Sequence, residues 1–327
     1  MSAGLDVVGI GNAIVDLIGQ ADDAFLDRHG MRKGAMTLVD EATAEALYGA
    51  MGPAVQLSGG SAGNTIAGLA SLGARTGYIG KVRADRLGAV FHHDIVTAGV
   101  RFPTPPAETG PATARCLIFV TPDAQRTMNT YLGACANLGP DDVDAELVGS
   151  AAITYLEGYL YDPPPAKAAF HRAAEISHAA GKKVALSLSD RFCVERYRGE
   201  FRRLAELHID YLFANESELT ALFQTDLASA LSEAAKAVDI AAVTRGPAGS
   251  VIAAGSSRIA VEAAAVEDVV DTTGAGDLYA AGFLFGLARG KALAECGRIA
   301  SLCAAEIISH YGGRPEVPLA RYVAERS

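Results

Sequence analysis

Short apolar runs rich in valine and isoleucine alternate along this chain with longer stretches in which apolar residues recur at helical spacing. Six of the runs lie at residues 5–11, 75–82, 151–158, 182–190, 209–215 and 240–246. Stretches between them, such as residues 61–73 and 164–181, open with Ser or Pro and close with Gly, as helices do. Continuous apolar strands that alternate with helices are typical of a parallel sheet. The pattern therefore predicts an α/β protein, with a mainly parallel sheet covered by helices on both faces.

Two segments interrupt this alternation. Residues from about 13 to 40 and from about 101 to 131 read as short strands separated by turns. The second segment opens with RFPTPPAETGP, which is dense in Pro and Thr and suits a connection between elements. Contiguous domains would not interleave in this way. We therefore expect one domain over residues 1–327, with a small β-rich lid that the two segments insert into the core.

Composition and charge narrow the class of protein. The chain has 327 residues, of which 50% are hydrophobic, enough to bury a large core. Its formal net charge of −10 argues against a protein that binds nucleic acid or an anionic membrane through a basic surface. Its first residues lack the pattern of a secretory signal, and no apolar run approaches the length of a membrane span. Five cysteines without C-x-x-C spacing indicate reduced thiols, so we expect a cytoplasmic protein.

The segment DTTGAGD, residues 271–277, opens an otherwise apolar helix. The N-terminus of a helix exposes unpaired N–H groups and partial positive charge, so it attracts anions. Gly274, Ala275 and Gly276 would let that backbone approach a ligand closely. Asp277 could accept a proton from a hydroxyl that attacks phosphorus, or it could simply stabilise the start of the helix. The segment predicts an anion hole with a candidate base beside it.

Three further turns have the same character: LSGGSAGN at 57–64, FANESELT at 213–220 and VTRGPAGS at 243–250. In the second of them, Asn215 ends a predicted strand and Glu218 falls in the first turn of a helix. An acid there could organise magnesium through water, or it could serve only as a cap. We expect all these turns at the carboxyl ends of parallel strands, which is where open α/β sheets bind ligands.

With these motifs the chain resembles the ribokinase-like, or PfkB, carbohydrate and nucleoside kinases. Residues 59–100 are similar to the family's first signature region, and residues 271–286 are similar to its second. The resemblance covers nearly the whole chain. It implies a ribokinase-like three-layer αβα sandwich and ATP-dependent phosphotransfer to an alcohol group, with ATP and Mg²⁺ as cofactors. A monovalent cation such as K⁺ lies beside the anion hole in some relatives, and the sequence leaves that point open.

The resemblance also implies roles for the motif residues. Carried over by position, Asp277 would be the catalytic base, and the anion hole beside it would stabilise the transferred phosphoryl group. Asn215 and Glu218 match the family's N-x-x-E motif near magnesium and phosphate, with Glu218 acting on the metal through water. Thr244 and Gly246 fall in the strand and turn that would line the ATP site.

Within the family the chain is most similar to the adenosine kinases, which implies the 5′-hydroxyl of adenosine as the acceptor. Asp16 would bind the ribose hydroxyls, and Arg126 would be a lid arginine that closes on the phosphates. Tyr159 and Phe192 would flank the aromatic base, although an isolated Tyr or Phe in an α/β protein is more often a core residue. The positions that complete the sugar site are Asn12, Gly59, Gly60, Ser61 and Asn64.

Three alternatives stand beside this interpretation. The nearest is a PfkB kinase for ribose, fructose, a 2-keto-3-deoxy sugar acid or another nucleoside such as inosine or guanosine. A dinucleotide-binding oxidoreductase is suggested by VVGIGNAI, but the third glycine of G-x-G-x-x-G would fall at Ile14. A non-catalytic sensor on the same scaffold could lose the base, yet Asp277 and Arg126 are both present. The sequence does not distinguish a monomer from a homodimer.

Overall fold

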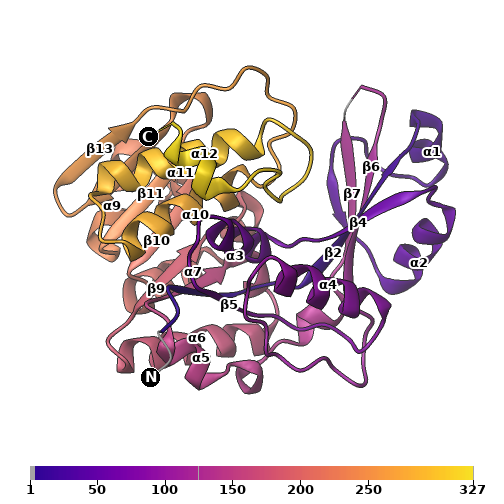
Figure 1. The fold of residues 1–327 in the computed structure, drawn as a ribbon, viewed down its shortest axis with the longest axis horizontal. Coiled ribbons are helices and arrows are strands. Elements are labelled where there is room, and N and C mark those ends of the chain that lie inside the picture. The colour runs from indigo at the N-terminus through magenta and orange to yellow at the C-terminus, as the bar shows by residue number, and fades with distance from the viewer. Residues whose placement is uncertain (1–3, 124, 327) are drawn as a thin grey trace.

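The computed structural model describes residues 4–123 and 125–326, and its centre is an eight-stranded sheet (Figure 1). The strand order is β13-β12-β11-β10-β9-β8-β1-β5. The parallel strands are β1 (Val7–Ile10), β5 (Thr76–Ile79), β8 (Ile153–Glu157), β9 (Lys183–Ser187), β10 (Tyr211–Asn215) and β11 (Ile240–Thr244). Each corresponds to a predicted apolar run, so the mainly parallel sheet is confirmed. The apolar pattern did not predict the antiparallel hairpin of β12 (Ser250–Ala254) and β13 (Ser257–Val261) at one edge.

Helices cover both faces of this sheet and bury two apolar clusters. Successive side chains of a strand point to opposite faces, so Val7 belongs to one cluster and Val8 to the other. On the Val7 face lie α3 (Ser61–Ser71), α4 (Arg86–Thr97), α10 (Ala275–Ala288), α11 (Leu293–Ile307) and α12 (Leu319–Ala324). On the Val8 face lie α5 (Ala145–Ser150), α6 (Pro164–Ala179), α7 (Arg191–His208), α8 (Glu216–Phe223) and α9 (Leu227–Ala237). The three layers are those of the predicted ribokinase-like αβα sandwich.

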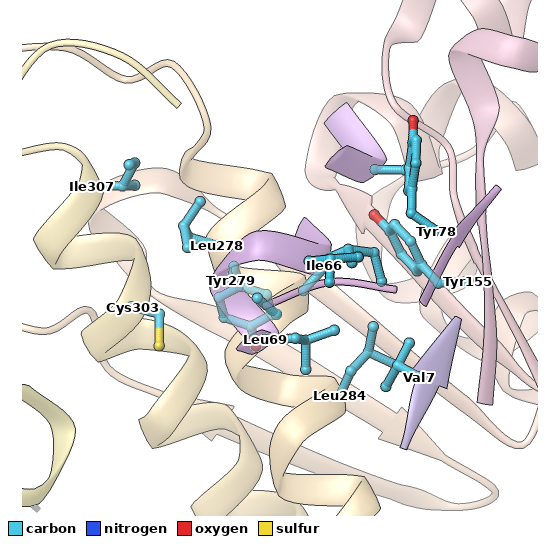
Figure 2. Packing of buried hydrophobic residues seen from close by; sticks show 14 of the residues in the cluster. Val7, Ile66, Leu69, Tyr78, Tyr155, Leu278, Tyr279, Leu284, Cys303 and Ile307 are labelled. Atoms are coloured by element: carbon cyan, nitrogen blue, oxygen red, sulfur yellow. The ribbon is translucent and has the colours of Figure 1, made fainter. Parts of the chain in front are cut away.

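Helix α10 packs between α3 and α11 in the Val7 cluster (Figure 2). Its residues from Leu278 to Leu284 are all buried. A Cβ on Gly68 of α3 would lie 2.5 Å from Leu278 Cδ1, and a Cβ on Gly282 would lie 2.7 Å from Ala300 Cα. These two glycines therefore set how closely the three helices cross. Although α10 is apolar all round, none of the helices in the described ranges is both long and apolar enough to cross a bilayer.

A second sheet stands to one side of the core (Figure 1), and in the described residues its strand order is β3-β7-β6-β2-β4. These strands are β2 (Ile14–Gln20), β3 (Met36–Leu38), β4 (Ala54–Ser58), β6 (Ala114–Val120) and β7 (Arg126–Tyr131). The short helices α1 (Asp23–Arg28) and α2 (Glu41–Ala50) belong to the same unit. The first excursion thus runs to residue 58, further than the predicted 13–40, because α2 and β4 are part of it. The second begins near residue 114, since Arg101 and Ala107 form bridges to Gly77 and Arg83.

Candidate active site

The DTTGAGD segment forms the turn into α10. Gly274 is the N-cap and has a φ of 78°, a left-handed conformation that favours glycine. Gly276 is exposed, and a Cβ on it would meet nothing within 4 Å. Within the described residues, no side chain caps this end of the helix. The first N–H groups of α10 therefore face open space that an anion could enter.

Asp277 lies in the first turn of α10 and is held by two side chains of α3. Ser61 Oγ donates to its Oδ1 at 2.6 Å, and Asn64 Nδ2 donates to its Oδ2 at 3.0 Å. Burial raises the pKa of Asp277, while these two hydrogen bonds and the charge of Arg314 oppose the rise. The structure thus brings the predicted base together with two residues of the predicted sugar site. A carboxyl with a raised pKa suits a general base that works near neutral pH.

Asp16 lies on lid strand β2, against the turn that Gly59 and Gly60 form before α3. A Cβ on Gly59 would lie 2.3 Å from Asp16 Oδ2, so only glycine leaves room for this carboxylate. Gly60 has a φ of 83°, and a Cβ on it would lie 2.1 Å from the carbonyl oxygen of Asn12. Burial raises the pKa of Asp16 to about 6, and the nearby charge of Asp277 adds to the rise. The acid of the lid and the acid of α10 therefore belong to one site.

Asn12 follows β1, and its side chain is turned toward Glu157 at the end of β8. Asn12 Nδ2 donates to Glu157 Oε1 at 2.6 Å, and the Ala62 N–H donates to Glu157 Oε2 at 2.8 Å. The exposed fractions of Glu157 and Asn12 are 1% and 3%. Burial raises the pKa of Glu157 to about 7. In this structure Asn12 supports the site through Glu157, and its direct contact with a substrate stays a prediction.

Arg126, the predicted lid arginine, begins strand β7 and reaches the 271–277 turn of the core. Its Nη1 donates to Asp271 Oδ2, and it also donates to Thr273 Oγ1 at 2.7 Å. Asp271 accepts further from the N–H groups of Thr273 at 3.0 Å and Gly312 at 3.1 Å. The exposed fractions of the Arg126 and Asp271 side chains are 9% and 7%. A buried ion pair therefore joins the lid to the turn that contains the predicted anion hole.

Tyr159 and Phe192 lie beyond the carboxyl ends of two paired strands. Tyr159 is in the 3₁₀ helix η3 (Gly158–Tyr161) after β8, and Phe192 is in the first turn of α7 after β9. Their exposed fractions are 38% and 57%, so neither is a core residue. The Tyr159 N–H donates to Ser189 Oγ at 3.2 Å, which links the two segments. Ser189 holds this position with a φ of 68°, a conformation that is unfavourable for a non-glycine residue.

The residues predicted for the ATP site lie further along the same sheet edge. Asn215 and Thr244 end β10 and β11 and are partners in the register of these strands. Asn215 caps α8: its Oδ1 accepts from the Glu218 N–H at 2.9 Å, and its Nδ2 donates to Glu218 Oε1 at 2.6 Å. Glu218 is 5% exposed, and burial raises its pKa to about 7. Gly246 opens the 3₁₀ helix η4 (Gly246–Ala248) and is exposed, with a φ of 56°.

Three charged residues of this site were not among the predicted set: Glu157, Asp271 and Arg314. The sequence context could have identified two of them. Glu157 is an acid at the end of an apolar strand, and Asp271 is the first residue of the glycine motif. For Arg314 the sequence offers a weaker indication, which is its place in the turn GGRP after α11. No pattern in a single sequence shows that this turn folds back onto α3.

Comparison with known proteins gives a consistent result. The model of the pfkB family of carbohydrate kinases matches residues 43–320. The chain is similar to the adenosine kinase from Sinorhizobium meliloti, with 52% identity, a TM-score of 0.93 and coverage of 99% of this chain and 100% of that one. It is also similar to a probable sugar kinase protein from Rhizobium etli CFN 42, with 48% identity, a TM-score of 0.93 and 99% of each chain covered. An uncharacterized sugar kinase of Archaeoglobus fulgidus is 30% identical over 257 residues, which are 77% of this chain and 98% of that one.

Proposed function

The chain belongs to the pfkB family of carbohydrate kinases, and we propose that it transfers the γ-phosphoryl group of ATP to the 5′-hydroxyl of adenosine. The observation that carries the proposal is the position of Asp277. This carboxylate lies in the first turn of α10, beside an open glycine turn, and is oriented by Ser61 and Asn64. Backbone N–H groups in such a turn can stabilise phosphoryl charge while the carboxylate receives the proton of the acceptor.

In this reaction the acceptor hydroxyl would lie beside Asp277 and attack the γ-phosphorus in line. Asp277 would orient that hydroxyl and take its proton as the new bond to phosphorus forms. Arg126 is paired with Asp271 in this structure, and it would act on the phosphates by exchanging that partner for their oxygens. Closure of the lid would exclude water, which otherwise competes as the acceptor. Positioning and electrostatics supply most of the catalysis in phosphoryl transfer, and this site offers both.

ATP would lie over the carboxyl ends of β10 and β11, lined by Thr244 and Gly246. PfkB kinases use ATP with Mg²⁺, an ion held mainly by phosphates and water with few protein ligands. That suits this chain, because within the described residues no three His, Cys, Asp or Glu side chains are arranged to hold a metal. Glu218 and Asn215 would contact the ion through water, and the bound ion would neutralise phosphate charge.

Adenosine is the acceptor that best accounts for the exposed aromatic pair. Tyr159 and Phe192 are both accessible at adjacent strand ends, and Ser189 links the segments that present them. Stacking on aromatic side chains contributes about 1–3 kcal/mol per base in proteins that bind single strands. A kinase for a simple sugar has no use for this surface. The 52% identity to an adenosine kinase supports the same acceptor.

A sugar kinase is the second candidate. It is favoured by the 48% identity to a probable sugar kinase protein, which is nearly as high. Asp16 and the glycine turn beside it would bind the hydroxyl pair of a free sugar as well as that of a nucleoside. On this alternative the reaction at Asp277 is unchanged, and only the aromatic pair loses its role.

A substrate panel distinguishes the two candidates. Release of ADP from Mg-ATP is followed with adenosine, inosine, guanosine, ribose, fructose and 2-keto-3-deoxygluconate, and ³¹P NMR identifies the phosphorylated position. We expect adenosine to have the highest kcat/KM, by roughly tenfold or more over ribose if the base stacks, and to give the 5′-monophosphate. A sugar with the highest kcat/KM would replace the acceptor, and absence of turnover with every compound would contradict the proposed function.

A further inference from the structure

We propose that Arg314 is a positioning residue for this reaction: its guanidinium ties the C-terminal loop to the first turn of α3 and sets the charge balance between Asp16 and Asp277. The inference rests on the proposed function, because it identifies what keeps the proposed base in place and ionised. Arg314 lies in the loop between α11 and α12. The loop is fixed to α3 at its far end as well, where the Leu319 N–H donates to Ser71 Oγ at 2.9 Å.

The contacts of Arg314 close the turn that leads into α3. Its Nε donates to the Ser58 carbonyl oxygen at 2.9 Å, and its Nη2 donates to Ser58 Oγ at 3.1 Å. Its Nη1 donates to the carbonyl oxygen of Gly63. Ser58 ends lid strand β4 and Gly63 is in the first turn of α3, so one planar side chain holds both sides of the intervening glycine turn. Ser61 lies within that span, and its hydroxyl donates to Asp277.

The neighbour of Arg314 is fitted to the same place. A Cβ on Gly313 would lie 2.4 Å from Asn64 Nδ2, so the loop backbone packs directly on this side chain. Asn64 Nδ2 donates to Asp277 Oδ2. The loop therefore supports both donors that orient Asp277, one through the span held by Arg314 and the other through Gly313.

Among the described residues, Arg314 has three acceptors, which are two carbonyl oxygens and a hydroxyl, all of them neutral. Its positive charge is therefore left to act on the ionisable groups around it, which come from four elements. These groups are Asp16 on β2, Asp277 on α10, Asp94 on α4 and Tyr78 on β5. Burial lowers the pKa of Arg314 to about 10, so it is charged at neutral pH. Burial dominates the raised pKa of Asp16 and of Asp277, and the charge of Arg314 opposes both rises.

The test compares Arg314→Gln, which removes the charge, with Arg314→Lys, which keeps the charge but loses the planar fork. Arg321→Gln is the matched control, because Arg321 is on α12 with its side chain 80% exposed. For each protein kcat/KM is measured from pH 5.5 to pH 9. For Arg314→Gln we expect the acid limb of the pH profile of kcat/KM to move up by about one pH unit. The reason is that an opposite charge nearby lowers the pKa of a carboxyl by 1 to 3 units, and this variant loses that charge. Arg314→Lys should keep the wild-type limb with a lower kcat, since one ammonium cannot span both sides of the turn.

Two outcomes would overturn the inference: an unchanged acid limb in Arg314→Gln, or an equal loss in both variants at every pH. If the wild type prefers a sugar, the profile is measured with that sugar, because the inference concerns Asp277 and not the base. Should the wild type show no turnover, urea unfolding still decides the question. Carboxyl groups whose pKa is raised in the folded protein make the free energy of unfolding fall as pH rises. In Arg314→Gln the loss of the positive charge should extend that fall beyond pH 6. Arg321→Gln should show the same pH dependence as the wild type. If the free energy of unfolding of Arg314→Gln had the same pH dependence as that of the wild type, the proposed role of Arg314 would be refuted.

Discussion

Asp16, Glu157 and Asp277 are three carboxylic acids of one site, of which Glu157 is buried and Asp16 and Asp277 are half-buried. Burial raises the pKa of all three, to about 6 for Asp16 and about 7 for Glu157. Ionised carboxyls are costly to bury, so such a group is retained where its charge or its hydrogen bonds have a use. In the proposed reaction Asp277 would act as the base. Glu157 has both oxygens occupied by Asn12 and the first turn of α3, which indicates a supporting role.

The role of Glu157 predicts how stability depends on pH. Its folded pKa lies above the ordinary value of 4.5, so the folded protein holds more protons than the unfolded chain between pH 4.5 and about 7. The free energy of unfolding should therefore fall as pH rises through that window, and Glu157→Gln should remove up to about 3 kcal/mol of the fall. Urea unfolding at several pH values measures this, with the exposed Glu206→Gln as the control. If the free energy of unfolding of Glu157→Gln fell with pH as steeply as that of the wild type, this carboxyl would not titrate as described.

At the scale of elements, the site is the meeting point of two helices, two strand ends and the lid. Helix α3 supplies Ser61 and Asn64, α10 supplies Asp277, and the lid strands supply Asp16 and Arg126. The strand ends of β8 and β9 supply the aromatic pair. Each element is held where it is by packing that is unrelated to the ligand, as at the crossing of α3 and α10 (Figure 2).

The aromatic pair carries a prediction about specificity. Phe192→Ala and Tyr159→Ala should each raise KM for adenosine by roughly 5- to 140-fold, the equivalent of the 1–3 kcal/mol that base stacking contributes. KM for ATP should change little, since the proposed ATP site lies over β10 and β11. Leu207→Ala is the control, because it shortens another exposed apolar side chain of α7. Unchanged adenosine kinetics in both aromatic variants would transfer preference to the sugar kinase alternative.

The sequence predicted most of these elements but fewer of the contacts between them. Apolar runs located the parallel strands because such strands are buried on both faces, and the glycine motif located the turn into α10. The sequence did not predict the hairpin of β12 and β13 or the strand β4. These strands have five residues each and lie at or next to the edge of a sheet, so none of them is a long apolar run. The sequence did not predict the roles of Glu157 and Arg314 for another reason. Glu157 binds Ala62, which is 95 positions away, and Arg314 binds Gly63, which is 251 positions away. Only the folded chain shows those pairs.

At the scale of the molecule, the lid and the core are joined at the place where the proposed transfer occurs. Arg126 of the lid is paired with Asp271 of the core, and Asp16 of the lid lies against the turn before α3. In the proposed reaction the acceptor and the phosphates would thus lie along one edge of the central sheet, and the lid sheet stands to the side of that sheet (Figure 1). If the lid moves during the proposed reaction, one movement would therefore change the binding of the acceptor and the surroundings of the phosphate together.

The measurement that tests the central claim most directly is the kinetics of Asp277→Asn, with Asp268→Asn in the exposed loop before the motif as the matched control. With its best acceptor and Mg-ATP, we expect Asp277→Asn to lose about 10²–10⁴-fold in kcat, because the general base is gone. Its melting temperature and its KM for ATP should stay close to those of the control. An Asp277→Asn enzyme as active as the control would contradict the assignment of Asp277 as the base.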